Sequence, residues 1–251
     1  MRRLLALAAA TLLIGASEPV LVPDVSQRNV EIRYSFTGAE LLLFGAILYP
    51  GGRVPERPAD IAVVVKGPTQ AIVVREKRKV AGIWMNVESE RFRSAPAFYA
   101  IASSRPLPEL IDERTAAIYE LGLDHLQLSP GAGMTPEDRQ RFESGLIDLR
   151  RRAGLFVSDP RGVEISQSVL YRARITLPAR APVGRYTAET FLIQDGRVLA
   201  AASRVVEVEK LGFERFVATA ANRWSLAYGL SAVLVSLLLG WGASAWFARR
   251  A

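Results

Sequence analysis

The run Trp224–Phe247 constrains this chain most, because its 24 residues include no charged side chain. A helix rises about 1.5 Å per residue, so a run of this length can cross a bilayer core of about 30 Å. Trp224 stands at one end and Trp246 near the other, where aromatic side chains favour the membrane interface. We therefore predict a transmembrane helix over 224–247, with a buried core helix as the alternative.

The first 17 residues have the parts of a secretory signal peptide. Arg2 and Arg3 precede an apolar stretch, Leu4–Gly15, which is too short to span a bilayer comfortably. Small residues then end the segment, so we expect a signal peptide over 1–17, with an uncleaved signal anchor as the alternative. Either version sends the body, 18–209, across the membrane, and the C-terminal helix then returns a cytoplasmic tail, 248–251.

Composition excludes several functional classes. The formal net charge is +7, and without the two terminal arginine pairs it falls to +3, too little and too dispersed for a nucleic-acid binder. Cysteine is absent and His125 is the single histidine, so the usual zinc and copper ligand sets cannot be assembled. No G-x-S-x-G, P-loop or dinucleotide motif occurs. We predict no catalytic residues, no metal site, no cofactor and no enzymatic activity.

The body reads as mainly β structure. Strand patterns and turn residues alternate along the chain, with the strongest hairpin signal at Asp195-Gly196. The apolar run Leu41–Tyr49 suits a strand covered on both faces, and Ile61–Lys66 with Ala71–Arg75 suits a strand–turn–strand unit. These patterns favour an antiparallel, immunoglobulin-like β-sandwich over 18–209.

Helical patterns interrupt the body over 107–154, where we expect a two-helix insertion. Leu107–Leu121 has apolar residues at helical spacing. The second helix has a clear start, with Thr135 as N-cap before Pro136, and Gly154 marks its end. A further amphipathic pattern over 210–223 predicts a juxtamembrane helix that lies on the membrane surface.

Small residues recur on one face of the predicted span, and such faces let a second helix approach closely. They are Ser225, Gly229, Ala232, Ser236, Gly240 and Ser244. The predicted partner of this face is an integral-membrane protein or a second copy of the chain. The alternative is that membrane helices are simply rich in small residues.

Two other stretches suggest an anion contact. Lys77, Arg78 and Lys79 belong to a charged run that reads as a solvated hairpin tip, with an anionic ligand or a lipid headgroup as the sharper hypothesis. The loop Gly131–Thr135 opens the second helix and could cradle an anion, although helix capping is its ordinary role.

Several segments together resemble one family. They are the leader, the β region Val30–Tyr49, the turn Pro182–Tyr186 and the closing segment Lys210–Trp241. They are similar to the alphaproteobacterial putative transmembrane protein family, and the resemblance implies a single-pass inner-membrane protein with most of its chain in the periplasm. The expected function is a non-enzymatic accessory role beside a membrane partner such as a transporter. A periplasmic module that binds small anions is the alternative.

Overall fold

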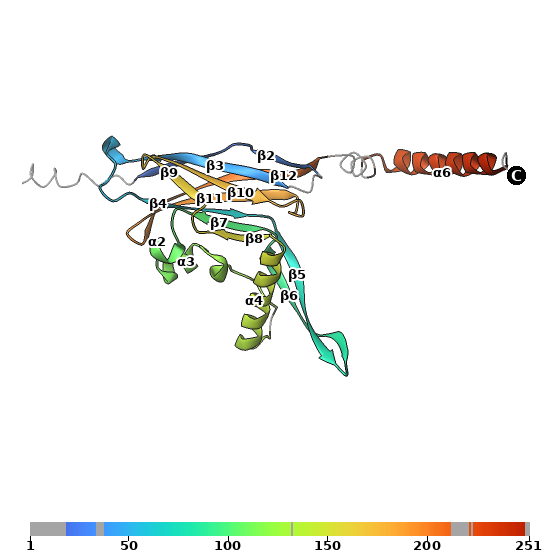
Figure 1. Cartoon of the computed structure of the whole chain (residues 1–251), viewed down its shortest axis with the longest axis horizontal. Helices are drawn as coiled ribbons and strands as arrows, with labels where there is room; N and C mark the ends of the chain where they lie inside the picture. The colour runs from blue at the N-terminus through green and yellow to red at the C-terminus, as the bar shows by residue number, and fades with distance from the viewer. Residues whose placement is uncertain (1–18, 34–37, 132, 212–220, 222, 249–251) are drawn as a thin grey trace, which may run out of the picture.

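The computed structural model describes residues 19–33, 38–131, 133–211, 221 and 223–248. Two sheets form the body (Figure 1). In spatial order, the four-stranded sheet contains β1 (Val20–Val25), β3 (Ala39–Leu48), β10 (Leu170–Leu177) and β9 (Val163–Ser166). The six-stranded sheet contains, also in spatial order, β2 (Asn29–Arg33), β12 (Arg197–Leu211), β11 (Gly184–Gln194), β4 (Asp60–Lys66), β7 (Tyr99–Ser103) and β8 (Phe156–Asp159).

The remaining elements lie outside these two sheets. β5 (Thr69–Val80) and β6 (Ile83–Pro96) pair only with each other in a long hairpin. The α-helices are α2 (Leu107–Leu110), α3 (Glu113–Ile118), α4 (Pro136–Arg152) and α6 (Ser225–Ala248), and the short 3-10 turns are η2 (Pro50–Gly52) and η3 (Leu123–His125). Over the described residues, no helix is both long and apolar enough to cross a membrane.

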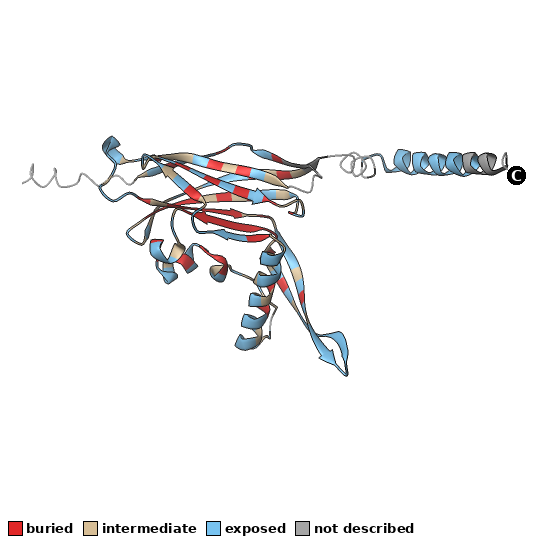
Figure 2. Ribbon diagram, in the orientation of Figure 1, coloured by how far each residue is buried: buried red, intermediate tan, exposed pale blue. Residues whose placement is uncertain are grey.

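The main core lies between the two sheets and continues under the helical insertion. Leu41 and Leu177 of the four-stranded sheet belong to the same buried cluster as Val63 and Val65, which lie on the facing side of β4. Every residue of β7 is buried, because α2, α3 and η3 add their own apolar residues to the same core from the other side (Figure 2). Apolar burial of this extent is the main stabilising term of the body.

A polar network fastens the insertion to the six-stranded sheet. Lys66 Nζ lies 2.8 Å from a Glu120 carboxylate oxygen and 3.3 Å from one of Glu189. Burial by itself would lower the pKa of Lys66, but the two carboxylates outweigh burial and raise it. Tyr99 Oη donates to the Glu120 carbonyl at 2.8 Å and accepts from the Gly122 N–H at 3.0 Å.

The prediction of a mainly β body with antiparallel sheets is confirmed, with two exceptions in strand direction. β12 pairs with β2 in parallel, and β7 pairs with β8 in parallel. The second exception has a topological cause, because the helical insertion carries the chain from the end of β7 back to the start of β8. The strand order is a feature of immunoglobulin-like sandwiches. So is the hydrogen bond that Tyr186 Oη, near the start of β11, donates to the Pro182 carbonyl.

Two strand predictions were wrong. The stretch 61–66 does not pair with 71–75, because β4 lies between β11 and β7 while β5 turns away to pair with β6. The strand over 41–49 is not covered on both faces, since Phe44 is 39% exposed and Leu48 is 53% exposed on the outer face of the four-stranded sheet.

The helix predictions were partly right. α4 has the predicted Thr135 cap, whose hydroxyl accepts from the Asp138 N–H at 3.2 Å, and Gly154 follows it with φ +65°. The helix expected over 107–121 is two short helices instead, because Ile111 is extended and Asp112 caps α3 anew. Leu149 of α4 is 56% exposed, whereas Phe142 and Leu146 are buried.

The segment boundaries near the termini are only partly described. β12 continues to Leu211, so the first two residues of the predicted 210–223 helix are strand. Residues 212–220 and 222 of that helix lie outside the described residues, as do the predicted signal peptide 1–17 and residues 249–251 of the predicted tail.

Candidate functional site

The β5–β6 hairpin projects from the sandwich and is its most prominent surface feature (Figure 1). β5 begins beside the end of β4, and the two hairpin strands pair from Thr69 with Pro96 out to Val80 with Ile83. Ala81 and Gly82 make the turn, both with positive φ, at +49° and +86°. This is the backbone that a tight two-residue hairpin turn requires, and glycine adopts it without strain.

The hairpin tip, which we define as Lys77–Val87, carries large apolar side chains in solvent. Ile83 is 70% exposed, Trp84 68% and Met85 49% (Figure 2). Because successive strand residues point to opposite faces, Trp84 lies on one face of the ribbon and Ile83 and Met85 lie on the other. The sequence predicted a solvated hairpin tip from the charged residues Lys77–Lys79, and the apolar run beside Ala81-Gly82 is the signal that could have located the turn itself.

Helix α4 braces the lower part of the hairpin through a small core of its own. Val74, Phe92 and Ala95 from the hairpin bury against Phe142 and Leu146 from α4. This cluster is separate from the core of the sandwich. The hairpin, which we also call the arm, therefore packs against α4 near its base and extends into solvent beyond that contact.

An ion-pair cluster, the ionic belt, marks where this support ends. Arg78 Nε lies 2.7 Å from Glu76, and its Nη2 lies 3.1 Å from Glu88 across the hairpin. Arg141 of α4 contacts the same two glutamates and also Asp138, at 2.8 Å. The hydrogen bond from Arg78 is the main reason why the pKa of Glu76 lies below its usual value.

The three predicted anion-contact residues do not converge on one site. Arg78 is committed to Glu76 and Glu88. Lys77 and Lys79 lie on the opposite face of β5, exposed, and have no ion-pair partner among the described residues. The two lysines are thus the free cations of the hairpin tip, beside the Trp84 that faces Lys79 across the strands.

The loop before α4 already holds an anion from the protein itself. The Gly131 N–H donates to Glu90 Oε1 at 2.7 Å, and a side-chain carbon at Gly131 would meet that oxygen at 2.5 Å. The carboxylate of Glu90 in β6 therefore fills the position that the sequence suggested for a ligand. The contact joins the loop to the hairpin.

The C-terminal helix α6 presents apolar side chains all round. Leu226 is 84% exposed and Leu239 69%. The predicted small residues Ser225, Gly229, Ala232, Ser236 and Gly240 lie along it, and the backbone at Ser244 belongs to the same helix. A side-chain carbon at Gly229 or Gly240 would meet no atom within 4 Å outside the helix backbone, so this face is open.

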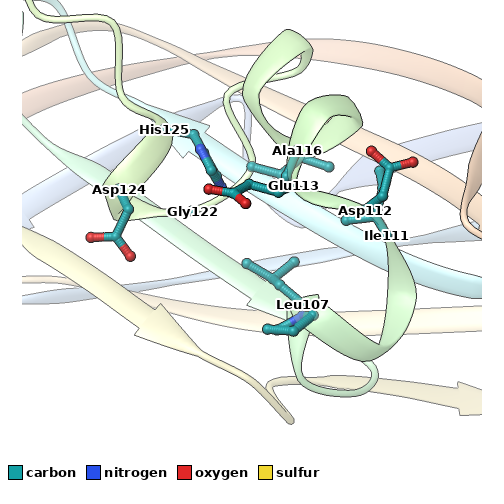
Figure 3. A pocket seen from close by; sticks show the side chains of 10 residues that line it. Leu107, Ile111, Asp112, Glu113, Ala116, Gly122, Asp124 and His125 are labelled. Atoms are coloured by element: carbon teal, nitrogen blue, oxygen red, sulfur yellow. The ribbon is translucent and has the colours of Figure 1, made fainter.

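A cavity of about 450 Å³ lies among α2, α3 and η3 (Figure 3). Leu107, Ile111 and Ala116 line it with apolar surface, and carboxylates and His125 stand around it. Figure 3 shows Asp112 and Asp124 at opposite ends of the pocket. The backbone N–H of Thr115 hydrogen-bonds to Asp112 and lowers its pKa, which suits a helix cap and not a proton-transfer group.

The titratable side chains that line this cavity are three carboxylates and His125. Its lining contains no serine, threonine or lysine beside His125 to act as a nucleophile. Within the described ranges, no three histidine, aspartate or glutamate side chains gather so as to hold a metal ion. The hairpin tip and α6 are therefore the candidate functional surfaces.

Comparison with known proteins gives a family and a distant structural likeness. No curated protein matches the chain significantly. The crystal structure of the sporulation control protein Spo0M from Bacillus subtilis aligns with 12% identity and a TM-score of 0.33, covering 83% of this chain and 56% of that one. The chain thus spans little more than half of that protein, and a likeness at this level carries no conclusion about function.

The family comparison covers nearly the whole chain and agrees with the motifs noted in the sequence. The model of the family described as "Putative transmembrane protein" (Alph_Pro_TM) matches residues 20–249. This range includes the sandwich, the hairpin, the helical insertion and all of α6. The chain therefore belongs to this transmembrane protein family.

Proposed function

We propose that the chain is a single-pass inner-membrane protein whose sandwich lies in the periplasm and acts, without enzymatic activity, beside an integral-membrane partner. The exposed apolar surface of α6 carries this proposal. A helix that presents leucines such as Leu226 and Leu239 to water on every side would be unfavourable, whereas the same surface is satisfied by lipid. The uncharged run 224–247 and the description of the family support the same placement.

The open small-residue face of α6 supports a helical partner. At 100° per residue, Ala232, Ser236 and Gly240 fall within one narrow sector of the helix. The Ser236 hydroxyl donates to the Ala232 carbonyl at 2.9 Å. The hydroxyl therefore has its hydrogen-bond partner within the helix and needs none from a neighbouring helix. In lipid, close backbone approach and van der Waals packing drive association, and small side chains permit both.

Co-purification in mild detergent tests the partner. Full-length protein would be isolated from native membranes as wild type and as a double variant, Ser236→Leu with Gly240→Leu. We expect the wild type to retain a membrane protein, or a second copy of itself, that the variant loses, because two leucines would hold the neighbouring helix away. Equal recovery of the same partners with both proteins would contradict the proposed helix pairing.

The helix offers a matched control. Ala227 and Ser231 are also four residues apart and small, but they lie on the side of α6 opposite to the small-residue face. Ala227→Leu with Ser231→Leu adds comparable volume toward lipid and should leave the partner bound. Carbonate extraction of all three proteins checks insertion independently, since release of the wild type into the aqueous fraction would contradict the membrane anchor itself.

A further inference from the structure

We propose that the hairpin tip, Lys77–Val87, is a second membrane contact that inserts its apolar residues into the interface of an anionic bilayer. This inference rests on the proposed function, because it takes α6 as the anchor that brings the body to the membrane. It adds a separate surface, on a different part of the fold, with its own chemistry.

Strand direction places the hairpin at the end of the sandwich from which the chain leaves for α6. β4 and β12 both run antiparallel to β11, so they run parallel to each other. Lys66 at the end of β4 and Val205 of β12 both pair with Thr187 of β11, and β12 then continues to Leu211. The hairpin and the connection to α6 therefore emerge from the same end (Figure 1).

The dimensions allow the tip to reach the membrane. A strand rises about 3.3 Å per residue, so β5 extends about 35 Å from its base. The connection between Leu211 and Ser225 can span at most about 50 Å, and about 20 Å if helical. An arm of this length is comparable to the distance that the connection allows between the sandwich and the bilayer.

The apolar residues of the tip surround the ribbon, which favours lipid over a protein groove. Val80 pairs with Ile83, and Arg78 pairs with Met85, so these side chains share one face. Trp84 lies on the other face. A protein groove would cover one face and leave the other in water, whereas an interfacial lipid layer surrounds the whole tip.

The free charges of the tip match an anionic surface. Lys77 and Lys79 flank the apolar residues on the face of Trp84 and have no ion-pair partner among the described residues. Long lysine side chains can lie along apolar surface and keep their ammonium groups at headgroup level. Arg78, by contrast, is already neutralised by Glu76 and Glu88 in the ionic belt, above the inserted part.

The packing of the hairpin on α4 lowers the entropy cost of inserting its tip. The α4 cluster and the ionic belt hold the hairpin up to Glu76 and Glu88. An arm fixed in this way loses little conformational freedom when its tip binds, so more of the contact energy remains as binding. Two attachments, α6 and the tip, would fix the tilt of the sandwich over the bilayer.

Depth-dependent quenching tests the proposal directly. The chain has no cysteine, so a single Ile83→Cys can carry an environment-sensitive fluorophore without further engineering. Full-length protein would be reconstituted in phosphatidylcholine vesicles with and without phosphatidylglycerol, together with lipids spin-labelled at the headgroup or along the acyl chain. We expect a blue-shifted label at position 83 that is quenched by shallow acyl-chain spin labels in the anionic vesicles.

Two further reporters separate this proposal from the anchor. Leu234→Cys reports α6, and Val54→Cys reports the opposite end of the sandwich, after η2, and should stay in water. Quenching of the label at 234 together with a water-exposed label at 83 would overturn the membrane contact of the hairpin tip but not the anchor. The tip would then bind a protein groove instead. Absence of quenching at both positions would overturn the proposed anchor as well.

Charge variants test the lipid class. Each lysine near an anionic membrane surface raises the partition coefficient between water and the membrane by about fivefold. Lys77→Gln with Lys79→Gln should therefore strongly reduce the fraction of molecules whose tip is inserted. High salt should act in the same direction. Gln70→Ala, at the base of the hairpin, is the control and should change nothing. Insertion that is equal in neutral and anionic vesicles, and insensitive to both lysines, would overturn the anionic-bilayer assignment.

Discussion

Tyr186 illustrates how a single polar contact fixes the path of the chain into a strand. Its Oη donates to the Pro182 carbonyl at 2.7 Å, while its ring is fully buried beside Phe98, with centroids 5.8 Å apart. Burial raises the pKa of Tyr186, so the phenol stays neutral and keeps its donor. The contact closes the turn before β11 and holds the chain at the edge of the core.

We expect Tyr186→Phe to lower the free energy of unfolding by about 1 kcal/mol, because the partly buried Pro182 carbonyl loses its donor. Urea denaturation of the full-length protein in detergent, followed by near-ultraviolet circular dichroism, measures the change. Tyr171→Phe is the control, since the Tyr171 hydroxyl lies 3.5 Å from Thr190 Oγ1 and contributes a much weaker bond. An equal effect of both substitutions would contradict a special role for the hydrogen bond between Tyr186 and Pro182.

At the scale of elements, the hairpin depends on α4. The belt arginines Arg78 and Arg141 share Glu76 and Glu88, so losing one charge weakens several contacts. Isolated surface pairs contribute little, whereas a shared set of charges that faces a packed helix can orient both elements. The belt lies between a buried cluster and an exposed apolar tip, so it joins α4 to the hairpin at the last supported residues.

Acid should loosen this arm before it unfolds the sandwich. The folded-state pKa of Glu76 is lowered, so its contribution is fully present above the unfolded value of about 4.3 and is lost as pH falls through the folded pKa. Spin labels at Arg75→Cys and Gln140→Cys, on β5 and α4, should give one narrow distance distribution at neutral pH. We expect that distribution to broaden below about pH 4.

Glu76→Gln should reproduce the broadening at neutral pH, because it removes the charge without removing the side-chain volume. Glu207→Gln is the matched control, since Glu207 pairs with Arg185 at 3.1 Å on the sandwich, far from the belt in the strand order. A distribution that stays narrow in acid and in Glu76→Gln would show that the apolar cluster alone positions the arm.

At the scale of the whole molecule, two separate apolar clusters imply two units of stability. The main core joins both sheets and the helical insertion, and the small one joins α4 to the hairpin. Leu192 is fully buried in the first, and Leu146 is 2% exposed in the second. Regions with separate cores can open independently, so the arm can loosen while the sandwich stays folded.

We expect Leu146→Ala to destabilise the arm locally by about 2–5 kcal/mol and to leave global unfolding nearly unchanged, whereas Leu192→Ala should lower global stability by a similar amount. Hydrogen exchange read by mass spectrometry would show faster exchange confined to α4, β5 and β6 in the first variant. If Leu146→Ala instead lowered the global urea midpoint as much as Leu192→Ala, the two clusters would form one cooperative unit.

Several features followed from the sequence because neighbouring residues decide them. Thr135, Pro136 and Gly154 set the ends of α4 through capping and backbone preference, and Asp195-Gly196 made the β11–β12 turn. The uncharged run 224–247 was visible in the sequence alone, and the family that the sequence resembled was confirmed by the match over residues 20–249.

Other features depended on residues far apart in the chain, and only the tertiary structure decided them. β5 pairs with β6 instead of β4 because β11 and β7 already occupy both edges of β4. Arg78 gained Glu88 across the hairpin, and the loop at Gly131 gained Glu90 of β6, 41 residues away, which turned two suggested anion contacts into internal ones. Local chemistry specifies turns and caps, but strand partners and the pairing of charges depend on which surfaces the folded chain brings together.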